Sequence, residues 1–328
     1  DGGGVVEMFG EQSRQLAYGL GSTFLIDELP TDDAHILLVA TDNAGVGVWR
    51  ADVSTGRVER VANGDFDTFG YVTDGNGYPV LRMDTIQNGA GYRVMRRAPG
   101  EGSWTRHMDV RRGARTTNSP DFTPVGAGPG AGQIYVLARP VDRDLLGLYL
   151  FDTATGQLSA PLQEGREADV STPVIHPATR AIFAMCEYGQ RLSCTSADRN
   201  VERHLRAVQS FVGPDVMLSL VDISSDANTW LLYATGPGEP GAYYVYDRTA
   251  ASMEPLAAVY PQAPVNALSP ITVVNYQSRD GVPLWAYVVA QPGNGPRPMV
   301  VLPHGGPEVR DHFDYDAYAQ FLASRGYV

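Results

Sequence analysis

The most constraining feature of this sequence is a strand-like run that ends in aspartate and recurs at a regular interval. Asp52, Asp152 and Asp247 each close an apolar run and precede a polar turn, and degenerate copies of the pattern lie at 96–100 and 196–199. The three aspartates are 100 and 95 residues apart, so the five copies repeat at about 48–50 residues. Aspartate suits this place because its side chain accepts hydrogen bonds from the backbone amides of the turn.

A period of about 40–50 residues with four strands in each unit is typical of β-propellers. Short runs of aliphatic, β-branched and aromatic residues, separated by glycine, aspartate, asparagine and proline, dominate the chain up to about residue 260. We therefore predict a mainly β fold: an incomplete β-propeller with about five blades in view and no long amphipathic helix among them. A β-sandwich with coincidental aspartate turns is the alternative.

The pattern changes near residue 255, where four prolines between 255 and 270 mark a linker-like stretch. Two strand-like runs follow, at 271–276 and 284–289. The Asp-Gly pair between them is a strong hairpin signal.

The last residues predict the opening of an α/β domain. The fully apolar run 299–302 suits a central strand buried on both faces. Residues 313–325 can form a helix with an apolar face. We therefore predict two domains, a partial β-propeller at 1–262 and the truncated start of an α/β domain at 263–328.

The composition excludes several kinds of chemistry. All 25 basic residues are arginine, because the sequence contains no lysine. Schiff-base catalysis, the phosphate-binding lysine of P-loops and the strand lysine of protein kinases are therefore ruled out. The formal net charge of −12 makes nucleic acid and anionic membranes unfavourable partners. Nothing in the pattern calls for a metal or another cofactor.

The two cysteines, Cys186 and Cys194, lie eight residues apart around a turn that contains glycine. A hairpin would bring them face to face. One interpretation is a disulfide, which would indicate a periplasmic or secreted protein. The other is a pair of unrelated half-buried thiols, compatible with the cytoplasm, because a disulfide demands specific geometry.

The segment His304-Gly305-Gly306-Pro307 follows the apolar run and precedes the predicted helix. Two glycines let the backbone turn sharply and bring an N–H close to a ligand. A His-Gly-Gly turn supplies one oxyanion-hole amide in α/β-hydrolases. Such an amide stabilises the negative oxygen that develops in acyl transfer. An ordinary glycine-rich turn is the alternative.

Four motifs make the end of the chain recognisable: Asn275–Gly281, His304–Pro307, Arg310-Asp311 and Tyr315–Tyr327. With them, residues 271–328 closely resemble the start of the catalytic domain of the prolyl oligopeptidase family of serine peptidases, in its acylaminoacyl-peptidase and dipeptidyl-peptidase-like branch. That family places a β-propeller before an α/β-hydrolase domain. The resemblance implies that 263–328 is the truncated N-terminal part of such a domain.

The resemblance implies a serine peptidase that hydrolyses short peptides, with the propeller gating access. The backbone N–H of Gly306 would be the oxyanion-hole donor, with Gly305 and His304 supporting the turn and Pro307 fixing its exit. The family nucleophile lies in a Gly-x-Ser-x-Gly elbow, and no serine in this chain has glycine two residues before it. We expect the Ser-Asp-His triad beyond Val328 and no activity from this chain alone.

Two alternatives stay open. The chain could be a non-catalytic β-propeller binding module instead of part of an enzyme. Arg310 could meet a substrate carbonyl or carboxylate, or form a structural ion pair with Asp311. Short peptides are the partners that the resemblance implies, and a homo-oligomer is compatible with it.

Overall fold

The computed structural model describes residues 4–10, 23–111, 121–140, 142–166, 168–263, 265–306 and 309–328. The chain divides into two compact units. Unit 1 is Asp1–Thr172 with Ala178–Ala181, and unit 2 is Pro173–Pro177 with Ile182–Val328. This division falls inside the predicted propeller, and the predicted domain boundary at residue 262 stays a prediction.

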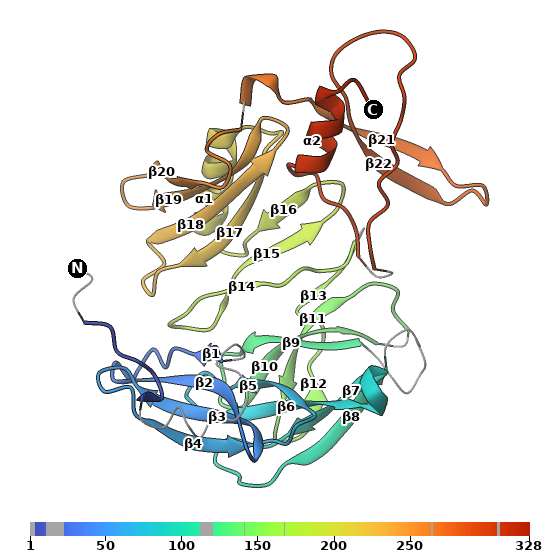
Figure 1. The fold of residues 1–328 in the computed structure, drawn as a ribbon. Helices are drawn as coiled ribbons and strands as arrows, with labels where there is room; N and C mark the ends of the chain where they lie inside the picture. Colours follow the sequence, from blue (N-terminus) through green and yellow to red (C-terminus); the bar gives the residue numbers. More distant parts are fainter. Residues whose placement is uncertain are drawn as a thin grey trace. The chain divides into compact units, whose positions relative to one another are not determined.

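Unit 1 contains three antiparallel sheets whose strands pair in chain order, except that β13 pairs with β11 in the third (Figure 1). The first sheet is β1 (Phe24–Asp27), β2 (His35–Asp42), β3 (Gly45–Asp52) and β4 (Val58–Asn63). The second is β5 (Thr68–Thr73), β6 (Pro79–Ile86), β7 (Gly91–Arg96) and β8 (Thr105–Arg111), with the 3-10 turn η3 (Gln87–Gly89) between β6 and β7. The third is β9 (Asp121–Ala127), β10 (Gln133–Arg139), β11 (Gly147–Asp152), β12 (Gln157–Leu158) and β13 (Gln163–Glu164).

Unit 2 contains two further sheets of the same kind, then a hairpin and a helix. The fourth sheet is β14 (Val174–Ile175), β15 (Ile182–Tyr188) and β16 (Leu192–Thr195), and helix α1 (Arg199–Val212) follows it. The fifth is β17 (Met217–Ile223), β18 (Thr229–Gly236), β19 (Glu239–Asp247) and β20 (Ser252–Ala258). After η4 (Val265–Ala267) come the hairpin β21 (Ile271–Gln277) and β22 (Pro283–Val289), and helix α2 (Ala317–Ser324). Five consecutive sheets in the described residues confirm the mainly β fold with about five blades.

The aspartate repeat has the structural cause that the sequence predicts. Asp52, Asp152 and Asp247 are the last residues of β3, β11 and β19, each the third strand in chain order of its sheet. The Asp52 carboxylate accepts hydrogen bonds from the amides of Ser54 and Thr55 at 2.8 and 2.9 Å. Asp152 accepts an equivalent hydrogen bond from the amide of Thr155. Asp247 accepts two, from amides of the turn that follows it. Each turn is therefore closed by its own aspartate.

The fourth copy of the repeat leads into a helix, so the expectation of no long helix among the blades is wrong. Asp198 accepts hydrogen bonds from the amides of Asn200 and Val201, which caps α1. Val201, Leu205 and Val208 recur at helical spacing and are buried. The sheet β14-β15-β16 has three strands, and β17 already belongs to the next sheet. Helix α1 therefore follows the third strand of its sheet, where the four-stranded sheets have their fourth strand.

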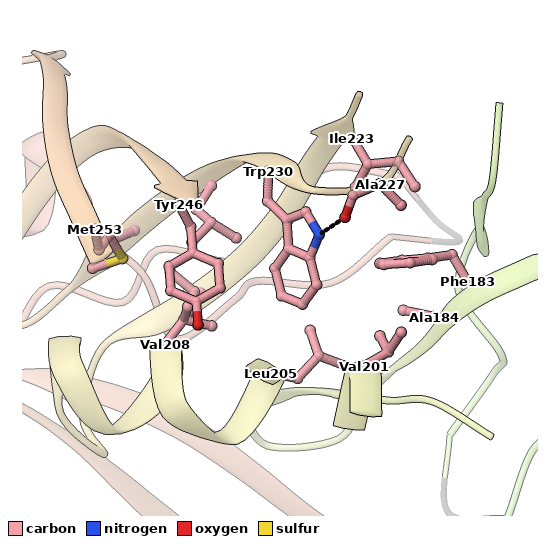
Figure 2. Packing of buried hydrophobic residues seen from close by; sticks show 13 residues of the cluster. Phe183, Ala184, Val201, Leu205, Val208, Ile223, Ala227, Trp230, Tyr246 and Met253 are labelled. Carbon is pink, nitrogen blue, oxygen red and sulfur yellow. Dashed lines mark hydrogen bonds between the residues drawn. The ribbon is translucent and has the colours of Figure 1, made fainter. Parts of the chain in front are cut away.

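The largest buried cluster of unit 2 explains why that helix forms. Figure 2 shows Trp230 between residues of α1 and Phe183, with its indole N–H donating to the carbonyl of Ala227 at 3.0 Å. Phe183 and Trp230 meet edge to face, with ring centroids 5.5 Å apart. The apolar face of α1 is therefore stabilised by tertiary packing. Unit 1 has cores of its own, the largest around Phe122 and Phe151.

The end of the chain departs from the prediction of a buried strand. Residues 299–302 form no regular strand, and Met299 and Val301 are 67% and 76% exposed. The amide of Val300 donates to the carbonyl of Val328 and the amide of Val328 to that of Pro298, the pattern of a parallel pair. A parallel strand is buried only when further strands and helices cover both of its faces. Among the described residues, Val328 pairs with one edge of the segment 299–302, and no further element covers the two faces of that segment.

The predicted helix at 313–325 forms over the shorter range of α2, capped by Asp316, and packs against β22. Within the described residues, no helix is long and apolar enough to cross a membrane.

Candidate functional site

The His304–Gly306 turn is exposed to solvent and held by a local contact. The Nδ1 atom of His304 lies 2.7 Å from the carbonyl oxygen of Gly305, and since a carbonyl can only accept, Nδ1 carries the proton. Gly306 has a φ of 138°, in a region that favours glycine. A Cβ built on Gly305 meets nothing within 4 Å. Pro307, predicted to fix the exit of the turn, lies outside the described residues.

Arg310 is half-buried and bonds to backbone carbonyls. Its guanidinium donates to the carbonyl of Tyr188 and, at 2.6 Å, to that of Gly189. The same guanidinium lies 5.1 Å from the ring centroid of Trp285 on β22, within cation–π range. In the part of the chain that the structure describes, no ion pair joins Arg310 to Asp311. In the described residues Arg310 thus contacts two backbone carbonyls and an indole ring instead of the Asp311 carboxylate, and substrate binding by Arg310 stays a prediction.

The carbonyls that Arg310 contacts belong to the tip of the β15–β16 hairpin. Cys186 and Cys194 face each other in the antiparallel register and are joined by a disulfide with a Cα–Cα distance of 4.0 Å. The same register pairs Tyr188 with Leu192, and Gly189 follows in the connecting turn. The covalent bond therefore lies beside the turn that receives the guanidinium.

Aromatic rings surround this contact. The rings of Tyr188 and His312 have centroids 4.5 Å apart. Phe313 is 2% exposed and lies under the guanidinium of Arg191 at 4.2 Å. Burial raises the pKa of Asp314 above its usual value, and the nearby carboxylates of the same segment add to this rise while His312 opposes it. The segment from Arg310 onward is thus packed against the hairpin tip instead of projecting into solvent.

Two hollows border this region of unit 2. An open groove of about 490 Å³ is lined by Gln190 and by residues of β21, β22 and their ends, among them Trp285. The amide of Gln190 donates to Asn275 there at 2.6 Å. A second hollow of about 410 Å³ lies among β16, α1 and β17, with Phe313 in its wall. Within the described residues, no group of three or more histidine, cysteine or acidic side chains could hold a metal ion.

Sequence reasoning named Arg310 and the cysteine pair but not their association. It missed Trp285, Tyr287 and Arg191, which complete the contact between the hairpin tip and the segment after the turn. The cysteine spacing signals a constrained turn, but it does not reveal what docks on it. Arg310 and Tyr188 are separated by 122 residues, and no local pattern connects them.

Comparison with curated proteins finds two relatives. Dipeptidyl aminopeptidase BIII of Pseudoxanthomonas mexicana is 27% identical over 290 residues, which is 86% of this chain and 41% of that protein. Dipeptidyl peptidase family member 6 of Caenorhabditis elegans is 25% identical over 207 residues, 56% of this chain and 28% of that protein. The chain thus spans less than half the length of either relative. No family model matches it.

Solved structures show the same fold at low identity. Oligopeptidase B from Leishmania major has a TM-score of 0.57 at 11% identity, over 98% of this chain and 46% of that one. The resemblance to the prolyl oligopeptidase family is confirmed. A puromycin-hydrolysing peptidase of Mycobacterium tuberculosis gives a TM-score of 0.54 at 15% identity, over 94% of this chain and 56% of that one. Acylaminoacyl peptidase of Pyrococcus horikoshii gives a TM-score of 0.52 at 12% identity, over 93% of this chain and 56% of that one. The fold of this chain, with the sheets predicted from the aspartate repeat, therefore recurs in about half of each of these peptidase chains.

Proposed function

We propose that this chain is the N-terminal part of a serine peptidase that hydrolyses short peptides, with the propeller gating access to the catalytic centre. The observation that carries the proposal is the exposed His304–Gly306 turn, with Gly306 in a glycine conformation, in a chain whose curated relatives are named dipeptidyl peptidases. A turn of this kind offers a backbone N–H to an incoming carbonyl oxygen.

In this proposal, the N–H of Gly306 donates to the carbonyl oxygen of the scissile bond as that oxygen becomes negative. The contribution is to the transition state, because the donor strengthens its bond as charge develops. His304 uses its Nδ1 proton on the Gly305 carbonyl, which closes the turn locally. For Arg310, the contacts with backbone carbonyls favour positioning over substrate binding.

The proposal places the nucleophile, the general base and its carboxylate partner outside this sequence, in which no serine has glycine two residues before it. In α/β-hydrolases the triad follows in the chain order serine, acid, histidine. We propose that all three lie in the part of the protein that follows Val328. The chain alone is then inactive, although it carries one donor of the oxyanion hole.

The full-length protein tests the proposal. A fluorophosphonate should label one serine, in a Gly-x-Ser-x-Gly elbow downstream of Val328, and the chain of 328 residues should remain unlabelled. Cleavage of short chromogenic peptides should be lost together with that serine. If well-folded full-length protein takes no label and cleaves no peptide, the chain is a non-catalytic binding module and the proposal fails.

The two glycines of the turn provide a matched pair of variants. Gly306→Ala places a side chain at a φ of 138° and displaces the N–H, so kcat should fall about 100-fold with KM little changed. Gly305→Ala is the comparison, because Gly305 lacks the positive φ of Gly306 and its added Cβ meets nothing within 4 Å in the described residues, so kcat should change by no more than about threefold. Equal losses from both variants would argue against Gly306 as the donor.

We also propose that the protein is exported to the periplasm or the medium. The disulfide between Cys186 and Cys194 supports this, because such bonds persist in oxidising compartments. Cell fractionation of the native host locates the protein, and mass spectrometry with and without a reductant measures the bond. Recovery of the protein in the cytoplasm with two free thiols would overturn export.

A further inference from the structure

We propose that Arg310 is a positioning residue, which ties the segment after the His304–Gly306 turn to the disulfide-bonded tip of the β15–β16 hairpin. This inference rests on the function proposed above, since it assigns Arg310 a part in holding the Gly306 N–H. It also predicts a property of the folded chain that does not depend on catalysis.

The disulfide constrains the backbone of the hairpin tip on which Arg310 docks. Cys186 and Cys194 are directly opposed in the register and covalently bonded, two positions before the last strand pair of the hairpin. Cross-linking across such a short loop removes many conformations of the intervening backbone. The carbonyls of the tip are therefore held in a narrow range of directions before any partner docks.

Three consecutive carbonyls of this tip accept hydrogen bonds from the later part of the chain. Those of Tyr188 and Gly189 accept from Arg310, and that of Gln190 accepts from the Tyr287 hydroxyl at 2.7 Å. A planar guanidinium can serve two neighbouring carbonyls at once, whereas an ammonium acts as a single point charge. Two neighbouring carbonyls thus suit arginine at position 310 better than lysine.

Two arginine–aromatic contacts hold the segment from 310 to 313, one to the hairpin tip and one to β22. Arg310 lies over Trp285 of β22, and Arg191 of the tip lies over Phe313. Phe313 is almost fully buried and also meets Tyr287, with ring centroids 5.8 Å apart. The segment from 310 to 313 is therefore held by the hairpin tip and by β22 together.

The anchored arginine lies close to the turn along the chain. Arg310 follows Gly306 by four residues, a span of at most about 14 Å when fully extended. In the described residues, the turn itself makes only the local contact of His304 with the Gly305 carbonyl. An oxyanion donor is effective only when its position is preorganised. Arg310 supplies that restraint on the C-terminal side of the turn.

Two variants of the full-length protein and one matched control test the inference. Arg310→Lys keeps the charge and removes the paired donors, and Cys186→Ser with Cys194→Ser frees the tip. The control is Arg96→Lys in unit 1, because Arg96 likewise donates to two successive carbonyls, those of Thr153 and Ala154. Near-ultraviolet circular dichroism establishes that each variant is folded.

The first readout is hydrogen–deuterium exchange of the amides in 304–306 and 309–313. Exchange there should become at least tenfold faster in Arg310→Lys and in the double cysteine variant, and should stay unchanged in Arg96→Lys. The second readout separates kcat from KM on a short peptide substrate. Arg310→Lys should lower kcat about tenfold and change KM by less than about twofold, since ground-state binding does not use this residue.

A rescue experiment distinguishes positioning from general damage. Added methylguanidinium should restore part of the kcat of Arg310→Ala, because it can occupy the site between the two carbonyls. If Arg310→Ala does not fold, the exchange data of Arg310→Lys decide alone.

The outcomes separate this inference from the proposed function. Unchanged exchange at 304–313 in both variants overturns the inference, whether or not the protein is a peptidase. A rise in KM with kcat unchanged also overturns it and makes Arg310 a substrate-binding residue. Faster exchange in a protein without peptidase activity would uphold the anchoring role and defeat only the proposed function.

Discussion

Gln320 on α2 bonds through one side-chain amide to both backbone groups of Ser269. Its oxygen accepts from the Ser269 amide at 2.7 Å, and its nitrogen donates to the Ser269 carbonyl at 2.9 Å. Both residues are buried, at 6% and 1% exposure. The pair joins the helix to the stretch before β21 and satisfies both backbone groups of a buried residue.

Gln320→Leu should therefore destabilise unit 2 by about 2–4 kcal/mol, because two buried backbone groups lose their partners. Urea unfolding followed by circular dichroism measures this. Gln277→Leu, an exposed exchange of the same two residue types on β21, should cost less than about 0.5 kcal/mol. Equal effects from the two variants would contradict the role of the Gln320 amide.

Gln320→Glu refines the same test through pH. At neutral pH the introduced carboxylate can accept from the Ser269 amide but faces its carbonyl without a proton, so the variant is destabilised. Burial raises the folded-state pKa of that carboxyl. Stability should therefore recover as the pH falls through this raised pKa, since the protonated form can donate again. A deficit that is independent of pH would be the contrary result.

The cap of α1 gives a local prediction. Asp198→Ala removes the acceptor for the amides of Asn200 and Val201, which should lower the free energy of unfolding by about 1 kcal/mol. Asp198→Asn keeps a side-chain oxygen that can cap the helix, so it should lower the free energy of unfolding much less. Thermal melts of the two variants, compared with the parent, distinguish capping from the mere loss of a charge.

The aspartate turns predict a pH dependence. Hydrogen bonds from Ser54 and Thr55 lower the pKa of Asp52 from 3.8 to about 2. A lowered folded-state pKa means that the ionised aspartate stabilises the fold above pH 3.8, and that this contribution is lost as the pH falls toward 2. The Tm of Asp52→Ala should lie below that of the parent at about pH 7, and the two should converge near pH 2. Asp33→Ala, which removes an exposed carboxylate before β2, controls for net charge.

The core of unit 2 should be most sensitive at Trp230. This residue is fully buried, and Trp230→Ala should cost about 3–5 kcal/mol through lost burial and the cavity left behind. Trp230→Phe should cost less, because the Ala227 carbonyl keeps a second hydrogen bond from Arg248 at 2.8 Å. Leu256→Ala, on the exposed side of β20, serves as control in the same urea titration. A similar loss from Leu256→Ala would contradict the assignment of the core.

Local chemistry makes much of the fold predictable. The turn after β3, and those after β11 and β19, depend on an aspartate bonding to amides two or three residues away, so the sequence alone carries the repeat. The same kind of signal is present for α1, where Asp198 precedes Val201, Leu205 and Val208 at helical spacing. Sequence reasoning misses the helix because its other residues are mostly polar and the repeat suggests a strand there.

Other features depend on neighbours that no local pattern names. The apolar run at 299–302 is expected to be buried, but hydrophobicity only states a preference, and burial requires other elements to cover both faces. The blades, the hairpin β21–β22 and the glycine turn at 304–306 can be predicted from local patterns, because each has a signal within a few residues. The docking of Arg310 on the Tyr188–Gly189 carbonyls cannot be predicted in this way. That contact needs two segments 122 residues apart to present matching donors and acceptors, and their approach is set by the packing between them.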